Sequence, residues 1–255
     1  MHMTLAELVE NLIPVAKSAG DEIMRIYKKI PESETKQDGS PVTEADKAAE
    51  AIILPALKKF APNIEIISEE NVKSHSIAAP EQFFLVDPLD GTREFLKRDG
   101  KGSFTVNIAL IKNGAPILGV VYAPALKRLF SGVVGQEAHE DQSGINVRST
   151  PGDGIVAVAS ISHRDQQTND WLTKKEISKT VSIGSSLKFC LLACGEADVY
   201  PRFGPTMEWD TAAGDAILRA AGGTVENPDG SRLVYGKPGY KNTAFIAHSG
   251  CLNDT

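Results

Sequence analysis

The sequence has few cysteines, no long hydrophobic run and no excess of basic residues. Its three cysteines are an odd number, and Cys190 and Cys194, four apart in a helical pattern, have no second pair to complete a zinc site. We therefore interpret them as reduced core thiols. No apolar stretch approaches the roughly 18 residues of a membrane-spanning helix, and the N-terminus lacks a basic region followed by an apolar one. These absences predict a cytoplasmic protein that is not exported, and they leave open a peripheral association with the inner face of the cell membrane.

The charge balance also narrows the function. A net charge of -6 argues against a protein whose main role is binding nucleic acid. It does not exclude an anionic small substrate, because bound Mg²⁺ reverses the sign of the charge locally. With 42% hydrophobic and 24% charged residues, the chain has the composition of a soluble globular protein, and 255 residues suffice for one large domain or two small ones.

One stretch, Phe83 to Thr92, dominates the sequence. Residues 83–86 form a continuously apolar run, typical of a strand buried on both faces, and Asp87 and Asp90 follow it in a polar turn. Ligands usually bind at the carboxyl ends of such strands. At a separation of roughly 4 Å, two carboxylates repel by about 4 kcal/mol at an effective dielectric near 20, so that both stay ionised only around a cation. The stretch indicates either a divalent-metal site or an Asx turn with a proline.

The first half of the chain is expected to contain two helices followed by a sheet. Residues 5–27 have helical apolar spacing, and a second helix opens at Thr43, where Thr43 and Asp46 have the spacing of a capping box. The strand 64–67 also ends in carboxylates, which favours a shared site, and His75 is expected to be a solvated loop side chain. Further strands are expected at 104–111, 116–122 and 129–134, the first two joined by a hairpin.

The polar, glycine-rich span 141–154 marks a change of pattern. We therefore predict an N-terminal α+β metal-binding half, 1–145, and a C-terminal α/β half, 146–255, that contributes Asp210 and nucleotide contacts. The second half is expected to alternate strands at 155–161, 181–183, 199–200 and 243–247 with helices at 165–172, 185–194 and 211–221.

Three features of this second half admit two interpretations each. The helix start Gly184-Ser185-Ser186-Leu187-Lys188 is suited to phosphate binding, or it is an ordinary serine cap with a solvated lysine. Arg202, in a rigid turn beside a strand end, is a phosphate or base contact or a surface charge. Asp210 is the obvious N-cap of the helix that follows, although a carboxylate there is also well oriented to bind a metal.

Two motifs together reveal a resemblance. Asp87-Pro88-Leu89-Asp90-Gly91-Thr92, preceded by Glu69-Glu70 and followed by Trp209-Asp210-Thr211-Ala212-Ala213-Gly214, resembles the paired signature of the inositol monophosphatase superfamily of metal-dependent, lithium-sensitive phosphatases. Four further segments resemble its 3′(2′),5′-bisphosphate nucleotidases of the CysQ type. These are Ser68-Glu69-Glu70, Ser160-Ile161-Ser162-His163, Gly184 to Cys190 and Tyr200 to Thr206.

The resemblance implies a fold and a set of site residues. The fold is a layered α/β/α/β/α sandwich. The implied catalytic residues are Asp46, Glu69 and Thr92, with Asp46 pairing with the Thr92 hydroxyl. The implied ligands of roughly two or three Mg²⁺ ions are Glu69, Asp87, the main-chain carbonyl of Leu89, Asp90 and Asp210. The implied substrate contacts are Glu69, Leu89, Asp90, Gly91, Thr92, His163, Ser185, Lys188, Arg202 and Asp210.

The implied activity is removal of the 3′-phosphate of adenosine 3′,5′-bisphosphate, giving AMP and phosphate, in sulfate assimilation. The sulfated nucleotide 3′-phosphoadenylyl sulfate is a second implied substrate. Attack by a water is expected to be assisted by Glu69 or by Asp46 with Thr92. His163 contacts the adenine or simply ends a strand. Two alternatives remain: the same chemistry on an inositol phosphate, and a regulatory protein that uses this fold to bind RNA or another protein.

Overall fold

Two long helices begin the chain. The computed structural model describes residues 3–29, 40–97, 102–149, 152, 154–160 and 165–252. For residues 40–42 it describes the backbone only. Helix α1 spans Leu5–Lys29 and includes Pro14, and α2 spans Ser40–Phe60. The expected opening of α2 at Thr43 is therefore wrong. Asp46 lies inside the helix, beyond the position of an N-terminal capping box.

The first sheet has seven strands in sequence order, β1 to β7. β1 is parallel to β2, and every later pair is antiparallel. The hairpin between β3 and β4 turns at Asn113 and Gly114, whose φ values of 51° and 71° suit that residue pair. The strands are β1 (Glu65–Ser68), β2 (Gln82–Asp90), β3 (Thr105–Lys112), β4 (Ala115–Ala123), β5 (Arg128–Val133), β6 (Ala138–Glu140) and β7 (Ser143–Ile145). The sequence did not predict β6 and β7, which have only three residues each.

The second sheet has five strands in the order β11-β12-β10-β8-β9. Its strands are β8 (Val156–Ser160), β9 (Lys179–Ile183), β10 (Val199–Arg202), β11 (Thr224–Glu226) and β12 (Phe245–His248). The helices of the second half are α4 (Gln166–Lys174), α5 (Leu187–Ala193) and α6 (Ala212–Ala220). Short helices interrupt three loops: η1 (Val72–Ser76), α3 (Thr92–Lys97) and η2 (Pro238–Tyr240). The sequence predicted the long elements within a few residues of these limits, and it missed β11, α3, η1 and η2.

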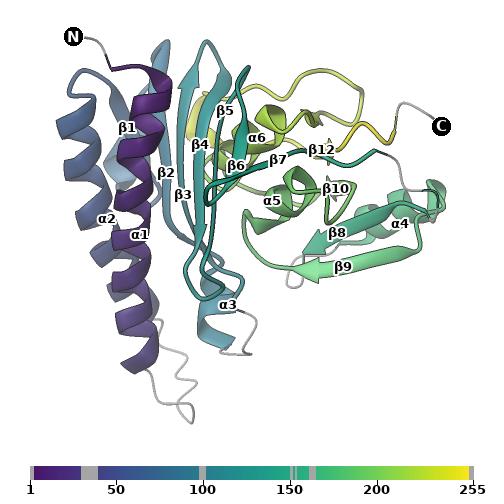
Figure 1. Ribbon diagram of the computed structural model, residues 1–255, viewed down its shortest axis with the longest axis horizontal. Coiled ribbons are helices and arrows are strands. Elements are labelled where there is room, and N and C mark those ends of the chain that lie inside the picture. Colours follow the sequence, from purple (N-terminus) through teal and green to yellow (C-terminus); the bar gives the residue numbers. More distant parts are fainter. Residues whose placement is uncertain are drawn as a thin grey trace.

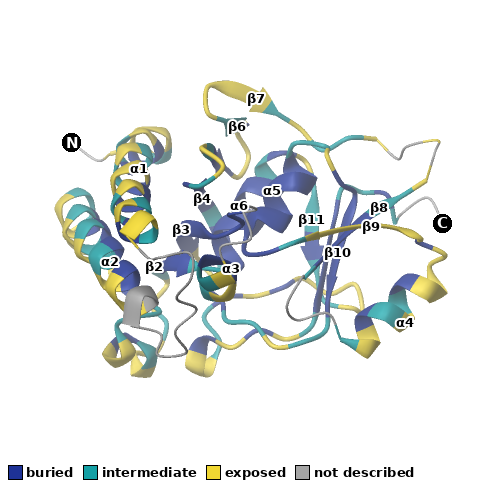
Figure 2. Cartoon of the chain, turned by 90° about the horizontal axis from the view of Figure 1, so that it is seen from below, coloured by how far each residue is buried: buried dark blue, intermediate teal, exposed yellow. Residues whose placement is uncertain are grey.

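The elements stack as α1 and α2, the first sheet, α5 and α6, the second sheet, and α4 (Figure 1). This order is the predicted α/β/α/β/α sandwich. Figure 2 shows that α5 and α6 are almost entirely buried between the sheets. A Cβ on Gly119 of β4 would lie 2.2 Å from the carbonyl oxygen of Ala213, so only glycine lets α6 pack so closely.

Three apolar clusters hold these layers together. One joins α1 and α2 to the outer face of the first sheet, and a second joins the inner face of that sheet to α5, α6 and the second sheet. The third, smaller cluster packs Leu172 of α4 against the far face of the second sheet. The two sheets fall on either side of the boundary proposed near residue 145, and the division into two halves stays a prediction. Among the helices in the described ranges, none combines the length and hydropathy needed to cross a bilayer.

Candidate active site

The site begins where β1 and β2 end. Because the two strands are parallel, with Ser68 opposite Val86, their carboxyl ends meet at one edge of the sheet. The Glu69 N–H donates to the carbonyl of Val86 at 3.1 Å, which continues the pairing one residue beyond β1. Glu69 therefore lies beside Asp87, the residue after Val86.

A β-bulge brings the two aspartates of β2 to one face. Asp87 lies opposite Asn107 on β3, but Asp90 lies opposite Thr105, so β2 holds one extra residue between them. In a regular strand, residues three apart point to opposite faces. The extra residue reverses that alternation, and Asp87 Oδ1 accepts a hydrogen bond from the Leu89 N–H at 3.0 Å within the bulge. The strand therefore continues through Asp90 and does not end at Val86 as predicted.

Asp210 comes from the second half of the chain. Its Oδ2 accepts a hydrogen bond from the Met207 N–H at 2.8 Å, and the N-cap of α6 is Thr211. The expectation that Asp210 is the N-cap is therefore wrong. The carboxylate instead fixes the turn before the helix and remains directed toward the edge of the first sheet.

Three of the predicted metal ligands converge here. Glu69, Asp87 and Asp210 each offer a carboxylate oxygen, and these atoms all lie within 4.8 Å of one another. Burial and the neighbouring carboxylates raise the pKa of Glu69 to about 7 and raise the pKa values of Asp87 and Asp210 well above their usual range. Such a partly buried set of hard oxygen donors fits Mg²⁺, because a divalent cation would offset the mutual repulsion.

Asp90 lines the same cavity in a different environment. Its Oδ2 accepts hydrogen bonds from the Ser186 N–H at 2.6 Å and from Asn107 Nδ2 at 3.3 Å. Burial raises the pKa of Asp90, while the nearby Lys188 charge and these donors lower it. The sequence analysis missed Asn107, although a lone amide in the apolar strand Thr-Val-Asn-Ile-Ala-Leu-Ile was a usable signal.

The cavity around these carboxylates has a volume of about 250 Å³ and gathers most of the predicted substrate contacts. Of the residues predicted from the sequence, its lining includes Glu69, Asp87, Leu89, Asp90, Gly91, Thr92, Ser185, Lys188, Arg202 and Asp210. Acidic and basic groups both line this cavity. Arg93 and Glu94 of α3 lie beside the carboxylates of the first sheet, and the second half contributes Lys188, Arg202 and Asp210. His163 lies outside the described residues.

Lys188 and Arg202 are both buried, each with 6% of its surface exposed. The Lys188 ammonium donates to the Ser185 carbonyl at 2.5 Å and lies 5.2 Å from the centre of the Tyr200 ring. Burial lowers the pKa of Lys188 to about 8, and Asp90 opposes that shift. Arg202 is held in place by donation to the carbonyls of Gly204 and Pro205. Neither cation is the solvated surface charge of the alternative interpretation.

The start of α5 differs from a serine-capped helix. Ser186 occupies the N-cap position without a side-chain capping bond, and Ser185 has φ 54°, an unusual value for a residue with a Cβ. A Cβ on Gly184 would lie 2.6 Å from Glu94 Cγ. The backbone here is therefore shaped by close packing against α3 and by the bond from Ser186 to Asp90.

Glu69, Asp87, Asp90 and Asp210 are called the acidic group below. Asp46 lies close to this group but outside the lining of the cavity. Burial, followed by the charges of Glu70 and Glu69, raises the pKa of Asp46 to about 8. Within the part of the chain that the structure describes, no hydrogen bond joins Asp46 to Thr92. Their pairing stays a prediction.

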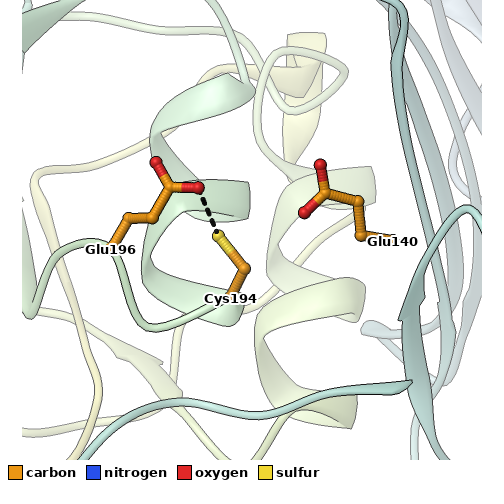
Figure 3. A group of neighbouring side chains, drawn as sticks. All are labelled: Glu140, Cys194 and Glu196. Carbon is orange, nitrogen blue, oxygen red and sulfur yellow. Dashed lines mark hydrogen bonds between the residues drawn. The ribbon is translucent and has the colours of Figure 1, made fainter. Parts of the chain in front are cut away.

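A second group of metal-ligand atoms lies away from this cavity. Figure 3 shows Glu140, Cys194 and Glu196 facing one another. The Arg128 guanidinium donates to Glu140 at 2.5 and 3.0 Å and to Glu196 at 2.6 Å, so a cation already offsets these charges. Burial raises the pKa of Cys194 to about 11, and all three cysteines are free. We assign no metal to this group, and the thiols are unpaired as predicted.

The chain is similar to known proteins in both its sequence and its fold. Residues 4–252 match the Inositol monophosphatase family. The chain is 44% identical over 249 residues to the 3′(2′),5′-bisphosphate nucleotidase CysQ of Salmonella typhimurium, covering 93% of this chain and 100% of that protein. The solved structure of CysQ from Bacteroides thetaiotaomicron superposes with a TM-score of 0.82 at 38% identity, covering 94% of this chain and 96% of that one.

A further similar structure is that of inositol monophosphatase from Anabaena, with a TM-score of 0.78 at 26% identity, covering 98% of this chain and 93% of that one. The family match spans both halves of the chain, including every carboxylate of the site. It therefore covers the same residues that the fold brings together at the edge of the first sheet. The chain belongs to the inositol monophosphatase family.

Proposed function

We propose that this protein is a Mg²⁺-dependent phosphatase that removes the 3′-phosphate of adenosine 3′,5′-bisphosphate, giving AMP and phosphate. The observation that carries the proposal is the placement of Lys188 and Arg202 in the cavity of the acidic group. A substrate with two phosphates needs positive charge beyond the metal ions. The 44% identical relative from Salmonella typhimurium is a 3′(2′),5′-bisphosphate nucleotidase, which supports the same substrate.

Different residues of the cavity are proposed to bind the metal ions, accept the proton and hold the phosphate. Glu69, Asp87, Asp90, Asp210 and the Leu89 carbonyl would hold roughly two or three Mg²⁺ ions, which supply charge neutralisation and water activation when bound. Glu69, which lines the cavity beside Asp87, is proposed to accept the proton of the attacking water. Asp46 acting with Thr92 is the alternative acceptor. Gly91 and Thr92 would hold the reacting phosphate at the start of α3.

The second half would bind the rest of the nucleotide. Lys188 and Arg202 supply the positive charge for the 5′-phosphate, Ser185 lies at the same wall of the cavity, and His163 is proposed to contact the adenine. The sulfated nucleotide 3′-phosphoadenylyl sulfate is the second proposed substrate, which places the activity in sulfate assimilation. The cytoplasmic location expected from the sequence stays a prediction, as does any peripheral association with a membrane.

Substrate choice is tested by phosphate release from adenosine 3′,5′-bisphosphate and from inositol 1-phosphate, side by side with Mg²⁺. We expect at least about a thousandfold preference in kcat/KM for the nucleotide, since two desolvated charge contacts of about 2 to 3 kcal/mol each are lost with the inositol ester. Lithium is expected to inhibit the reaction. A preference for the inositol ester would favour the activity named for the Anabaena structure. No turnover of either would favour a binding protein.

Metal binding is tested by thermal unfolding at two pH values. The pKa values of Asp46, about 8, and Glu69, about 7, lie above their unfolded values, so the folded chain holds more protons than the unfolded chain between about pH 4 and pH 8. The metal-free protein should therefore lose stability as pH rises through this window. We expect Mg²⁺ to raise the Tm of chelator-treated protein more at pH 8 than at pH 5. An equal gain at both values would contradict the proposed site.

A further inference from the structure

His75 connects the two chain segments that carry the acidic group. Its Nε2 lies 2.8 Å from the Ser68 carbonyl oxygen. Because a carbonyl only accepts, Nε2 carries the proton of this bond. The imidazole ring stacks on Trp209, with ring centres 4.6 Å apart and planes 26° from parallel. The sequence-based expectation of a solvated histidine is therefore wrong.

The first of these contacts fixes the backbone of Glu69. The Ser68 carbonyl and the Glu69 N–H belong to one peptide unit, whose planarity makes them move together. The N–H donates to Val86 at 3.1 Å on one side, and His75 donates to the carbonyl on the other. The direction in which the Glu69 side chain leaves the backbone is therefore set partly by His75.

The second contact reaches the residue before Asp210. Trp209 is 3% exposed, and its ring also lies near that of Tyr240, with ring centres 6.4 Å apart and planes 37° from parallel. The Tyr240 hydroxyl donates to the carbonyl of Ile77 at 2.8 Å, directly after η1. Trp209 and η1 are thus joined twice, through His75 and through Tyr240.

We propose that His75 is a positioning residue that fixes the separation between Glu69 and Asp210 and thereby sets the affinity of the site for divalent metal. These two carboxylates come from different halves of the chain and repel one another, so some contact must hold their backbones together without the cation. The structure assigns that contact to the stack of His75 on Trp209. The proposal rests on the metal site proposed above and is independent of the nucleotide substrate.

The fold of η1 does not depend on the histidine alone. The Ser74 hydroxyl accepts from the Ser68 N–H at 3.2 Å and donates to the Asn71 carbonyl at 2.7 Å. The segment therefore keeps its own attachment to β1 when His75 is replaced. Variants at position 75 should fold, which makes their metal affinity measurable.

The test uses Mn²⁺ alone, which takes the same oxygen ligands as Mg²⁺ and whose free ion is counted by electron paramagnetic resonance. His75→Ala removes the hydrogen bond and the stack, and we expect its Kd for Mn²⁺ to rise about tenfold. His75→Phe keeps the stack, and we expect it to recover part of that loss. His139→Ala, on β6 at the far side of the first sheet, is the matched control and should bind Mn²⁺ like the parent.

The outcomes separate the two proposals. Parent-like Mn²⁺ binding by His75→Ala overturns the role of His75 while leaving the metal site in place, and so does a lowered Tm with unchanged affinity. A parent protein that binds no Mn²⁺ overturns both. A weaker affinity in His75→Ala with partial recovery in His75→Phe supports the positioning role, because a purely structural residue would not change affinity in that order.

Discussion

Asp90→Asn is expected to reduce turnover by ~1000-fold, equivalent to about 4 kcal/mol of transition-state stabilisation, without loss of stability. The amide keeps the shape of the side chain and one acceptor for the Ser186 N–H, but it lacks the charge that a hard divalent cation requires. Neutralisation of Asp90 removes its repulsion with Asp87 and Asp210 but also its attraction to Lys188, so the two changes in stability oppose one another. Initial rates and thermal unfolding of the same sample, with and without Mg²⁺, provide the measurement.

Asp198→Asn is the matched comparison. Asp198 is fully buried and accepts from Arg148 at 2.7 and 2.6 Å, outside the cavity. Its neutralisation removes the charge of this ion pair from a fully buried position and is expected to cost about 3 kcal/mol of stability, while the folded fraction retains its turnover. Near-normal turnover of Asp90→Asn would remove Asp90 from the metal site.

Lys188→Met is expected to cause the second large loss of activity. Methionine fills the space of the lysine stem but removes the charge, and we expect kcat/KM for adenosine 3′,5′-bisphosphate to fall about a hundredfold. Turnover of adenosine 3′-monophosphate, which lacks the second phosphate, should change less than about threefold. Steady-state kinetics on the two nucleotides isolate the contribution of the 5′-phosphate.

Lys237→Met controls for the loss of a partly buried lysine. Lys237 also lies over a tyrosine ring, 5.5 Å from the centre of Tyr235, and its ammonium pairs with Glu208 at 2.6 Å, but it does not line the cavity. Its replacement should leave the ratio of the two activities unchanged. If Lys188→Met instead weakens both reactions equally, Lys188 acts through Asp90 and the assignment to bisphosphate substrates loses its basis.

The local motifs could be predicted from the sequence because their chemistry is contained in a few neighbouring residues. Asp87 and Asp90 follow an apolar run, and Glu69 follows another, so the edge of the sheet was identifiable without knowledge of the fold. The bulge that turns both aspartates to one face could not be predicted from the sequence, because it depends on the register of β2 against β3. Asn107 was missed for the same reason.

Contacts between distant segments account for the remaining differences. His75 was expected in solvent because no residue close to it in the sequence indicates a contact, and Trp209, on which its ring stacks, lies far along the chain. The sequence identified Lys188 and Arg202 as candidate contacts, but it could not predict that they are buried. Their desolvation depends on how α5 packs between the two sheets. Short elements such as β6 and β11 carry too few residues to show a period.

The layer formed by α5 and α6 between the two sheets also determines when the protein can become active during its synthesis. The seven strands of the first sheet are complete at Ile145, yet α5 and α6, which cover the inner face of that sheet, are encoded later. Until they leave the ribosome, that face is an unprotected apolar surface of the kind that chaperones bind. Asp210 arrives with the same late segment. The acidic site is therefore completed only when the sheet is covered, and an incomplete chain lacks one of the carboxylates of that site.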